Sequence, residues 1–366
     1  MAQEEVCSRG FLAAYLHNSY ANKDLGWVVG VADEVVLWLV GQVCRVRQGL
    51  KIGLGLKKRC QEPFAGPDKA IQVESNMDAS LSPPVRQGIK LYRELTRQHS
   101  IVRRARSIAR SGTAFLLSRR AHVPMDQDWI LFPYYHHVFD DERRGFERHL
   151  KYMRRFGEFI SLDDAVEAMQ NPVGIEGRYF CVSFDDGFRN CATNATPILV
   201  DHGCPAAFFV PTDYVGKELD ADWDVLQHFF AGARKYGALM DFLSWDDCRS
   251  MVAAGMTIGS HTCGHVRLTD LEPEELERQL RRSKAIIEEE LGAPCVHFAC
   301  PWGRPGRDFD PDRHAACLRE IGYRSLLTTD RGPNFSGTSP YAIRREETRA
   351  AEGTWLLRYF WTREAA

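Results

Sequence analysis

From about residue 129 onward the chain alternates short apolar segments with longer amphipathic ones, and this alternation restricts the fold more than any other feature. The short segments have the length of strands and are apolar throughout, as expected for strands that are buried on both faces. Strands that alternate with helices predict an α/β fold with a parallel sheet, either open or closed into a barrel. The apolar segments are WILFPYY, RYFCVSF, PAAFFVP, MTIGS, CVHFACP and YRSLLTT.

The intervening helices are indicated by the residues at their ends. SLDDAVEAM opens with Ser161 and an acidic first turn, and SWDDCRSMVAAG opens in the same way with Ser244. The segment 273–291 begins with a proline and is followed by Gly292, the usual asymmetry of a helix. A further helix is expected over RGFERHLKYMRRFG, ending at Gly157.

The net charge of −2 conceals an asymmetry between two parts of the chain. Residues 1–125 contain 19 Lys and Arg against 10 Asp and Glu, whereas the remainder contains 28 against 39. Residues 26–44 are the most apolar stretch, but Asp33 and Glu34 near its middle would each cost roughly 2.5–3.5 kcal/mol in a membrane span. Residues 89–120 predict a basic, partly amphipathic helix that either lies on an anionic membrane surface or packs on the body of the protein.

Cysteine usage and the N-terminal residues bear on the compartment. Eleven cysteines are scattered along the chain without a CxxC pair, whereas a secreted protein is expected to pair its cysteines. The N-terminal residues MAQEEVCSRG also lack the basic-then-apolar pattern of a secretory signal. We therefore expect a cytoplasmic protein, with membrane association as the open alternative and no nucleic acid partner.

Three polar clusters follow predicted strands, at the carboxyl ends where parallel α/β folds gather their active sites. In the first cluster, SFDDG, Asp185 and Asp186 come directly after an apolar strand. Adjacent carboxylates point in different directions, so one can bind a metal ion while the other faces a water molecule. The alternative is a plain turn that caps the next helix.

The second cluster, HTCGH, places His261 and His265 four residues apart after a strand. Two histidines at this spacing can ligate Zn²⁺ or a similar ion, and with one carboxylate they leave positions open for water and substrate. The third cluster, FACPWG, ends a strand at Pro301 and Trp302. A backbone N–H in this turn could hold a developing oxyanion, although the cluster taken alone reads as a plain strand-ending turn.

In this order, the three clusters resemble the motifs of the polysaccharide deacetylase family, whose catalytic unit is the NodB homology domain. FACPWG and the earlier stretch YYHHVFDD resemble the branch that acts on bacterial poly-N-acetylglucosamine. The resemblance covers about residues 130–350 and implies an irregular (β/α)7 TIM-like barrel. The chain would then consist of a deacetylase-like catalytic domain at 126–366, preceded by a basic, largely helical N-terminal extension.

The extension divides into two predicted parts. Residues 77–125 are expected to form the basic helical segment. Residues 1–76 have no predicted fold and are expected to be disordered or to lie before the true start, because Met77 opens a shorter reading frame.

The resemblance also implies roles for individual residues. Asp185 would be the general base, and the backbone N–H of Trp302 would stabilise the oxyanion. The ion would be a divalent metal, first of all Zn²⁺, with Co²⁺, Ni²⁺ or Fe²⁺ as alternatives. Its ligands would be Asp186, His261 and His265.

The sequence departs from the family pattern at the arginine that orients the base in many members. Ala299 takes its place in the third motif. We expect Arg344 or Arg345, in the late segment YAIRREE, to supply the charge instead.

A second departure concerns the late histidine that protonates the leaving amine in many members. No histidine follows His314, which itself lies in a predicted helix. We expect His136 in YYHHV to take this role, with His137 as the neighbour to test beside it. The alternative is that both are ordinary histidines at a strand end.

Residues 212–243 form a longer connection than strand–helix units usually have. Its aromatic side chains, Tyr214 and Trp223 among them, could stack on sugar rings at the rim of the site. Alternatively, they form the core of a short helical insertion.

Together these features predict metal-dependent hydrolysis of N-acetyl groups on a glycan, which is hydrolysis of a carbon–nitrogen bond other than a peptide bond. Hydrolysis of O-acetyl esters on a carbohydrate would use the same water and the same ion. The alternatives from other classes are a glycan-binding pseudoenzyme and an adaptor protein led by the basic N-terminal arm.

Overall fold

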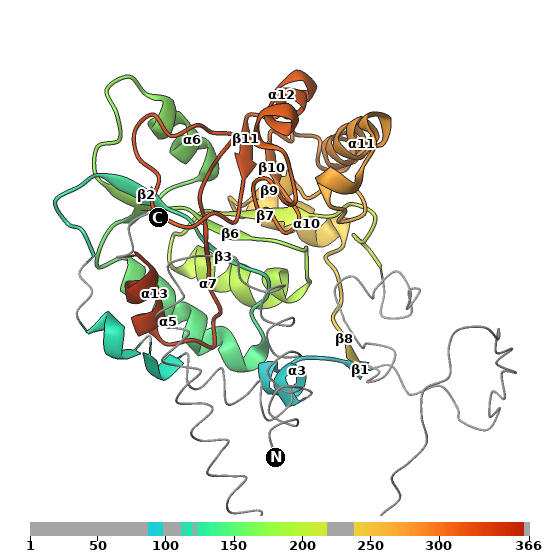
Figure 1. Ribbon diagram of the computed structural model, residues 1–366. Helices are drawn as coiled ribbons and strands as arrows, with labels where there is room; N and C mark the ends of the chain where they lie inside the picture. Colours follow the sequence, from blue (N-terminus) through green and yellow to red (C-terminus); the bar gives the residue numbers. More distant parts are fainter. Residues whose placement is uncertain (1–86, 98–110, 114, 120–122, 218–237, 362–366) are drawn as a thin grey trace, which may run out of the picture. The chain divides into compact units, whose positions relative to one another are not determined.

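The computed structural model describes residues 87–97, 111–113, 115–119, 123–217 and 238–361 (Figure 1). Residues 83–100 and 114–365 form one compact unit, to which all the elements named below belong. The strands are β1 (Gln87–Gly88), β2 (Trp129–Leu131), β3 (Pro133–Tyr135), β4 (Glu158–Phe159), β5 (Arg178–Phe180), β6 (Val182–Phe184), β7 (Ala206–Val210), β8 (Ala238–Leu239), β9 (Thr257–Ser260), β10 (His297–Ala299), β11 (Ser325–Leu327) and β12 (Glu346–Glu347).

The helices alternate with these strands along the chain, as the sequence predicts. Short 3-10 turns are η2 (Asp140–Glu142) and η4 (Leu268–Asp270), and η3 (Cys191–Ala195) is a π-helical turn. The α-helices are α3 (Tyr92–Arg97), α5 (Arg143–Met153), α6 (Leu162–Gln170), α7 (Thr196–Asp201), α10 (Trp245–Ala253), α11 (Pro273–Leu291), α12 (Pro311–Ile321) and α13 (Thr354–Trp361).

The strands confirm the predicted α/β class. Seven of them form one parallel sheet in the order β11-β10-β9-β7-β6-β3-β12. β5 pairs with β2 on one side and with β4 on the other, and β2 and β5 each lead after one residue into a strand of the large sheet. The expected irregular barrel is thus a seven-stranded parallel half-barrel, whose strand ends gather the loops of the candidate site.

The segment that contains β12 links the two edges of this sheet. Ile343 forms a parallel bridge with Leu327 of β11, and Glu346 pairs with Pro133 of β3. The segment therefore hydrogen-bonds to the first and the last parts of the sheet within a few residues. Arg345 lies between these two contacts, so the link fixes the position of its side chain.

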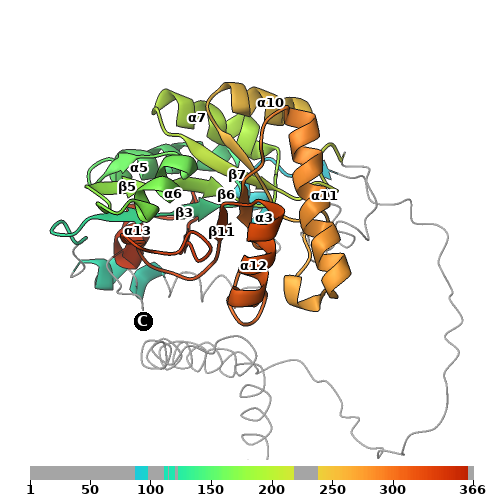
Figure 2. The ribbon, with the colours of Figure 1, turned by 90° about the horizontal axis from the view of Figure 1, so that it is seen from above.

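The strands contribute alternate side chains to two apolar clusters, one on each face of the sheet. Figure 1 shows α6 on one face of the sheet, and its buried side chains pack with Phe132 and Phe209 from the strands. The opposite faces of the strands, Phe208 and Val210 among them, pack against the other helices. In Figure 2, α11 and α12 lie side by side on the outside of this second cluster.

The structure confirms the helix ends predicted at Ser161 and Gly292, but the end predicted at Gly157 is wrong. The hydroxyl of Ser161 accepts a hydrogen bond from the Asp164 N–H, and Gly292 ends α11 in the left-handed conformation with φ 63°. The helix before Gly157 already ends at Met153. Gly157 instead allows close approach, since a Cβ there would lie 2.4 Å from the carbonyl oxygen of Arg178.

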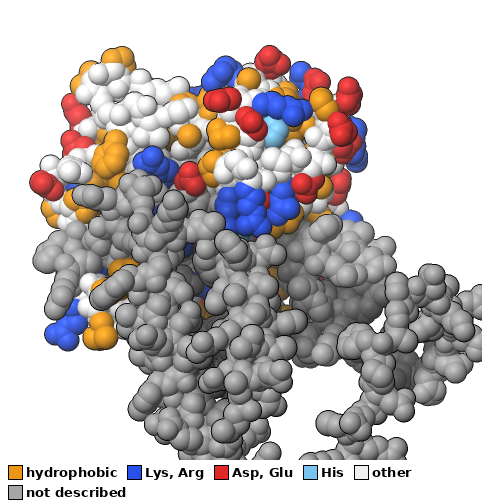
Figure 3. Space-filling model, viewed as in Figure 1, with side chains coloured by type: hydrophobic (Ala, Val, Ile, Leu, Met, Phe, Trp, Pro, Cys, Tyr) orange, Lys and Arg blue, Asp and Glu red, His pale blue; other side chains and the backbone are white. Residues whose placement is uncertain are grey.

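The outer surface over α11 and α12 is mixed in charge. On the face in Figure 3, acidic and basic side chains are interspersed where these helices lie. Exposed ion pairs within α11 join Arg278 to Glu275 and Arg281 to Glu277. Such exposed pairs contribute little to stability.

Most of the predicted N-terminal features lie outside the described residues. These include all of residues 1–76, with the apolar stretch 26–44, and residues 98–110, 114 and 120 of the predicted helix 89–120, of which α3 is a described part. The predicted boundaries of the extension stay predictions. Among the described residues, no helix is both long enough and apolar enough to cross a membrane.

A buried histidine ties α5 to the segment that precedes α13. The Nδ1 atom of His149 lies 3.1 Å from the Tyr135 hydroxyl, and its Nε2 atom lies 2.9 Å from the Glu352 carbonyl oxygen. With Nε2 donating and Nδ1 accepting, the neutral ring satisfies both partners. Burial lowers the pKa of His149 to about 4, because the charged ring would lose its hydration.

We predict that His149 makes the fold less stable in mild acid. Between about pH 6.5 and pH 4 the unfolded chain binds a proton at this residue that the folded chain does not, so the free energy of unfolding falls as the pH falls. The full loss should be about 3 kcal/mol. Urea unfolding of the protein and of His149→Gln from pH 7.5 to pH 4.5 would measure it. The partly exposed His202→Gln is the control, and equal pH slopes for all three proteins would contradict the prediction.

Candidate metal centre

Asp186, His261 and His265 come together at the carboxyl ends of β6 and β9. Asp186 Oδ1 lies 3.2 Å from His265 Nε2 and 3.5 Å from His261 Nε2. One ligand atom from each residue falls within 4.8 Å of the other two, and both histidines are buried. Three converging N and O donors of this kind can hold a divalent cation, so the structure brings the predicted ligands together.

The ring of His261 is oriented by a backbone group of the neighbouring strand. Its Nδ1 atom lies 2.8 Å from the carbonyl oxygen of Ala299 in β10. Since a carbonyl only accepts, Nδ1 carries the proton and Nε2 presents its lone pair toward Asp186. This second hydrogen bond is the usual device that fixes the tautomer of a metal-ligating histidine.

The turn that carries both histidines is held by α11. The side-chain oxygen of Gln279 accepts hydrogen bonds from the N–H groups of Cys263, at 2.9 Å, and Gly264, at 3.1 Å. Gln279 is buried, with 6% of its surface exposed. Sequence reasoning missed this residue, and the only signal was an amide on the apolar face of a predicted helix.

Backbone strain is concentrated in the same turns. Among the described residues, the non-glycine residues with positive φ are Asp186 at 71°, Thr262 at 65°, His265 at 52° and Trp302 at 58°. Side chains other than glycine disfavour this region, and residues held there cluster at functional sites. All four lie in the clusters that the sequence singled out.

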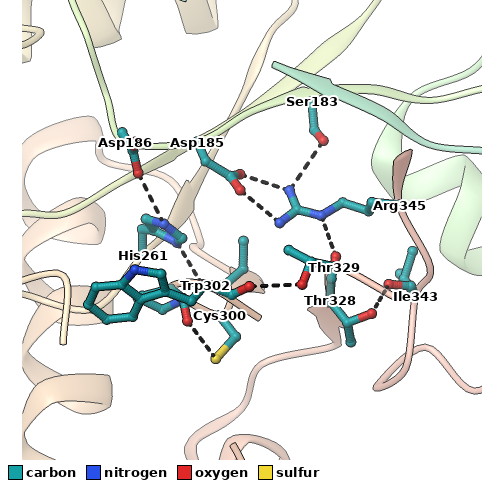
Figure 4. Close-up of polar contacts among 12 residues, drawn as sticks. Ser183, Asp185, Asp186, His261, Cys300, Trp302, Thr328, Thr329, Ile343 and Arg345 are labelled. Carbon is teal, nitrogen blue, oxygen red and sulfur yellow. Dashed lines mark hydrogen bonds and ion pairs between the residues drawn. The ribbon is translucent and has the colours of Figure 1, made fainter. Parts of the chain in front are cut away.

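Asp185 forms a buried ion pair with Arg345. The two guanidinium nitrogens of Arg345 donate to the two carboxylate oxygens at 2.8 and 2.7 Å (Figure 4). Burial alone would raise the pKa of the Asp185 carboxyl, but the Arg345 charge outweighs it and holds that pKa below its ordinary value.

Arg345 is itself fully fixed. It is 0% exposed, its Nε donates to the Thr328 carbonyl oxygen at 2.8 Å, and its guanidinium lies 4.3 Å from the centre of the Tyr134 ring. Of the two arginines expected to replace the one missing at Ala299, Arg345 therefore contacts Asp185. Arg344 is only partly buried, and its N–H donates to the Asn334 side chain.

The two histidines of YYHHV point to different surroundings. His136 is partly buried, and its charge acts on Asp186. Burial would raise the pKa of Asp186, but the charge of His136 and the neighbouring rings of His261 and His265 hold that pKa well below its ordinary value. His137 instead lies 3.2 Å from Glu142 and packs on the Phe139 ring.

Trp302 borders the metal ligands with its ring and its peptide. Its indole is 42% exposed, and the ring centre lies 4.7 Å from that of His265. The Trp302 carbonyl accepts a hydrogen bond from the Thr329 hydroxyl at 2.8 Å. Within the described part of the chain, the hydrogen bonds of this turn leave the Trp302 N–H without an acceptor. Pro301, just before it, is buried.

The structure describes one of the two aromatic residues that are expected at the rim, Tyr214. Tyr214 is 3% exposed and packs against the ring of Phe242 at 5.2 Å between centres. The expectation that it stacks on a sugar is wrong for this structure, because apolar packing covers the ring, as the alternative of core packing predicts. Trp223 lies outside the described residues.

Comparison with known proteins places this site in a family. The family model described as polysaccharide deacetylase matches residues 175–326, a range that contains both aspartates, both histidines and Trp302. The YxkH protein of Bacillus subtilis (strain 168), named as a member of the polysaccharide deacetylases, is 21% identical over 204 residues. That match covers 56% of this chain and 63% of the length of YxkH. Residues 175–326 of this chain therefore match the polysaccharide deacetylase family.

The chain is also similar to solved structures. IcaB from Ammonifex degensii superposes with a TM-score of 0.52 at 23% identity, over 64% of this chain and 97% of that one. The Streptococcus pyogenes deacetylase PplD, solved in complex with acetate, gives a TM-score of 0.48 at 18% identity, over 63% of this chain and 96% of that one. The IcaB likeness establishes the half-barrel fold of this chain.

We predict that removing Arg345 alone destabilises the fold more than removing the pair. In Arg345→Met the Asp185 carboxylate stays buried without a partner, which should lower the free energy of unfolding by about 3–5 kcal/mol. Adding Asp185→Asn should restore a large part of that loss. Urea unfolding of the two single variants and the double variant measures the coupling, with Arg344→Met as the matched control. Additive effects, or an equal loss in Arg344→Met, would refute the assignment.

Proposed function

We propose that this chain is a metal-dependent hydrolase that removes N-acetyl groups from a glycan. The observation that carries the proposal is that two adjacent carboxylates make different contacts. Asp186 converges with His261 and His265, whereas Asp185 is held ionised beside them by Arg345. A site for a Lewis acid next to a fixed, ionised base is an arrangement that can hydrolyse an amide.

The donor set fits a divalent cation. Two imidazole nitrogens and one carboxylate suit Zn²⁺, Co²⁺, Ni²⁺ and Fe²⁺, and we propose Zn²⁺ as the first to test. Burial lowers the pKa of His265 below its ordinary value, so this ring favours the neutral form that a ligand must have. When bound, the ion supplies a water of lowered pKa and polarises the acetyl carbonyl.

Asp185 is our candidate to take the proton of the attacking water. Arg345 occupies one acceptor site on each carboxylate oxygen, and each oxygen keeps a second one. The ion pair therefore fixes the direction of the carboxylate without blocking it. We assign Asp185 as the general base and Arg345 as the residue that positions it.

The charge that develops on the acetyl oxygen needs a donor, and the Trp302 N–H is our candidate. The turn that contains it is anchored to the end of β11 by the Thr329 hydroxyl. A fixed peptide N–H stabilises an oxyanion better than water does, because it does not have to reorient during the reaction.

The leaving amine needs a proton, for which we propose His136. Its charge lowers the pKa of both Asp186 and Glu347, which supports a position near the candidate metal centre. His137 is the weaker candidate because its ring already contacts Glu142.

The substrate we propose is an N-acetylated polysaccharide or oligosaccharide. The family match supports a glycan, and the resemblance of FACPWG and YYHHVFDD to one branch favours poly-N-acetylglucosamine. The O-acetyl ester of a carbohydrate stays the second candidate, since the same groups would hydrolyse it. The complete set of Asp185, Asp186, His261 and His265 argues against a binding protein without turnover.

We predict acetate release from N-acetylglucosamine oligomers that depends on both carboxylates. The metal-stripped protein should be inactive and should regain activity with Zn²⁺ or Co²⁺. Asp186→Ala should lose the ion and the activity together, whereas Asp185→Asn should keep the ion and lose activity by at least about 10²-fold. Acetate is quantified enzymatically, and bound metal by elemental analysis. Unchanged release in Asp186→Ala would refute the proposal, and release from O-acetylated but not N-acetylated sugars would select the ester.

A matched pair of variants tests the general acid. His136→Gln should lower kcat by about 10²- to 10⁴-fold while the metal content stays the same. The neighbouring His137→Gln should stay within a few-fold of the unchanged protein, because His137 faces Glu142. Equal kcat values for His136→Gln and the unchanged protein would exclude His136 as the acid.

A further inference from the structure

The Trp302 indole contacts two side chains, His265 and Arg267, on the rim of the site. On one side, its ring centre is 4.7 Å from that of the metal-ligand candidate His265. On another, the guanidinium carbon of Arg267 lies 4.9 Å from the indole centre. The indole is nevertheless 42% exposed, so part of its surface is open to a ligand.

Arg267 is held in place by a buried carboxylate. Its Nε donates to Asp308 Oδ1 at 2.7 Å, and its Nη1 lies 3.6 Å from Asp270 Oδ2. Asp308 is 1% exposed, and its other carboxylate oxygen accepts a hydrogen bond from the Arg304 N–H at 3.0 Å. The Asp308 side chain therefore joins the loop after His265 to the loop after Trp302.

The peptide of Trp302 has a different anchor. The Thr329 hydroxyl donates to the Trp302 carbonyl at 2.8 Å, and the Thr329 N–H donates to the next carbonyl, that of Gly303, at 2.9 Å. These bonds hold the residue at its positive φ of 58° from the end of β11. The indole and the peptide of Trp302 are thus fixed by separate groups.

We propose that Asp308 and Arg267 form a clamp that fixes the Trp302 indole as one wall of the glycan site, so that both are positioning residues for substrate binding. The clamp acts through the indole, whereas Thr329 acts through the peptide. This inference rests on the proposed function for its substrate, and the clamp itself rests on the contacts alone.

The physical basis is the stacking of a cation on an aromatic face. A guanidinium over an indole restricts the ring to one orientation, and the bond to Asp308 prevents the guanidinium from following the ring into solvent. An exposed, rigid aromatic surface beside the reacting groups binds the apolar face of a sugar with little loss of side-chain freedom. Such a wall contacts the substrate before and during the reaction alike, so it affects KM more than kcat.

Kinetics of two variants separate the two anchors. Arg267→Met keeps the side-chain stem but removes the cation, and it should raise KM for N-acetylglucosamine oligomers about tenfold with kcat within about twofold. Thr329→Val should do the reverse and lower kcat about tenfold, because the oxyanion donor is no longer fixed. Asp308→Asn should follow Arg267→Met. Arg281→Met removes an exposed ion pair of similar length on α11 and is the control that should change neither constant.

A spectroscopic measurement tests the clamp independently of turnover. The protein is labelled with 5-fluorotryptophan, and its Trp302 resonance in the ¹⁹F spectrum is identified by its loss in Trp302→Phe. This resonance should shift or broaden in Arg267→Met and stay unchanged in Arg281→Met. An unchanged resonance in Arg267→Met would overturn the clamp, whether or not the protein releases acetate.

The remaining outcomes distinguish the two proposals. A shifted resonance with an unchanged KM would show that the clamp exists but does not position the substrate, which overturns the inference. If kcat, metal content and thermal stability all fall together in Arg267→Met, the role of Arg267 is structural only, and this result would also overturn the inference. Absence of acetate release from the unchanged, metal-loaded protein would contradict the proposed function, while the ¹⁹F spectra would still decide the clamp.

Discussion

The buried ion pair between Asp185 and Arg345 is the interaction on which the site depends. Both partners are almost fully buried, and each would be a large penalty for the fold without the other. Their meeting requires the segment after β11 to reach back to β3, so the link between the sheet edges and the orientation of the base are one structural event. A carboxylate fixed in this way leaves its neighbour Asp186 free to face the two histidines.

The three turns around this ion pair each contain a residue with a positive φ angle. Asp186, His265 and Trp302 each adopt a positive φ, which costs about 1–3 kcal/mol for a residue other than glycine. The surrounding hydrogen bonds hold these conformations, from Gln279 for the histidine turn and from Thr329 for the tryptophan turn. The packing of α11 on the sheet and the pairing of β11 within it thus offset the backbone strain that directs these side chains toward one point.

Sequence reasoning succeeded where function depends on residues close together in the chain. The doublet Asp185-Asp186 and the spacing of His261 and His265 are local patterns, and each follows an apolar strand whose end position is implied by the fold class. It was wrong about Tyr214, whose exposure depends on how residues 212–217 pack beside Phe242. It also left Arg344 and Arg345 unresolved, because neighbouring residues on a strand point to opposite faces and the register of β12 is not written in its local sequence.

The sequence by itself determined the α/β class, the order of the strands and helices, and the chemical types gathered at the strand ends, because periodicity and capping are properties of neighbouring residues. Only the tertiary structure decided that Arg345 pairs with Asp185, that His137 contacts Glu142, and that Asp308 holds Arg267 against Trp302. Each of these contacts joins residues that lie far apart in the chain, or depends on which face of a strand end a side chain takes. Such choices are made by the packing of the whole sheet and its helices, and no short stretch of sequence contains them.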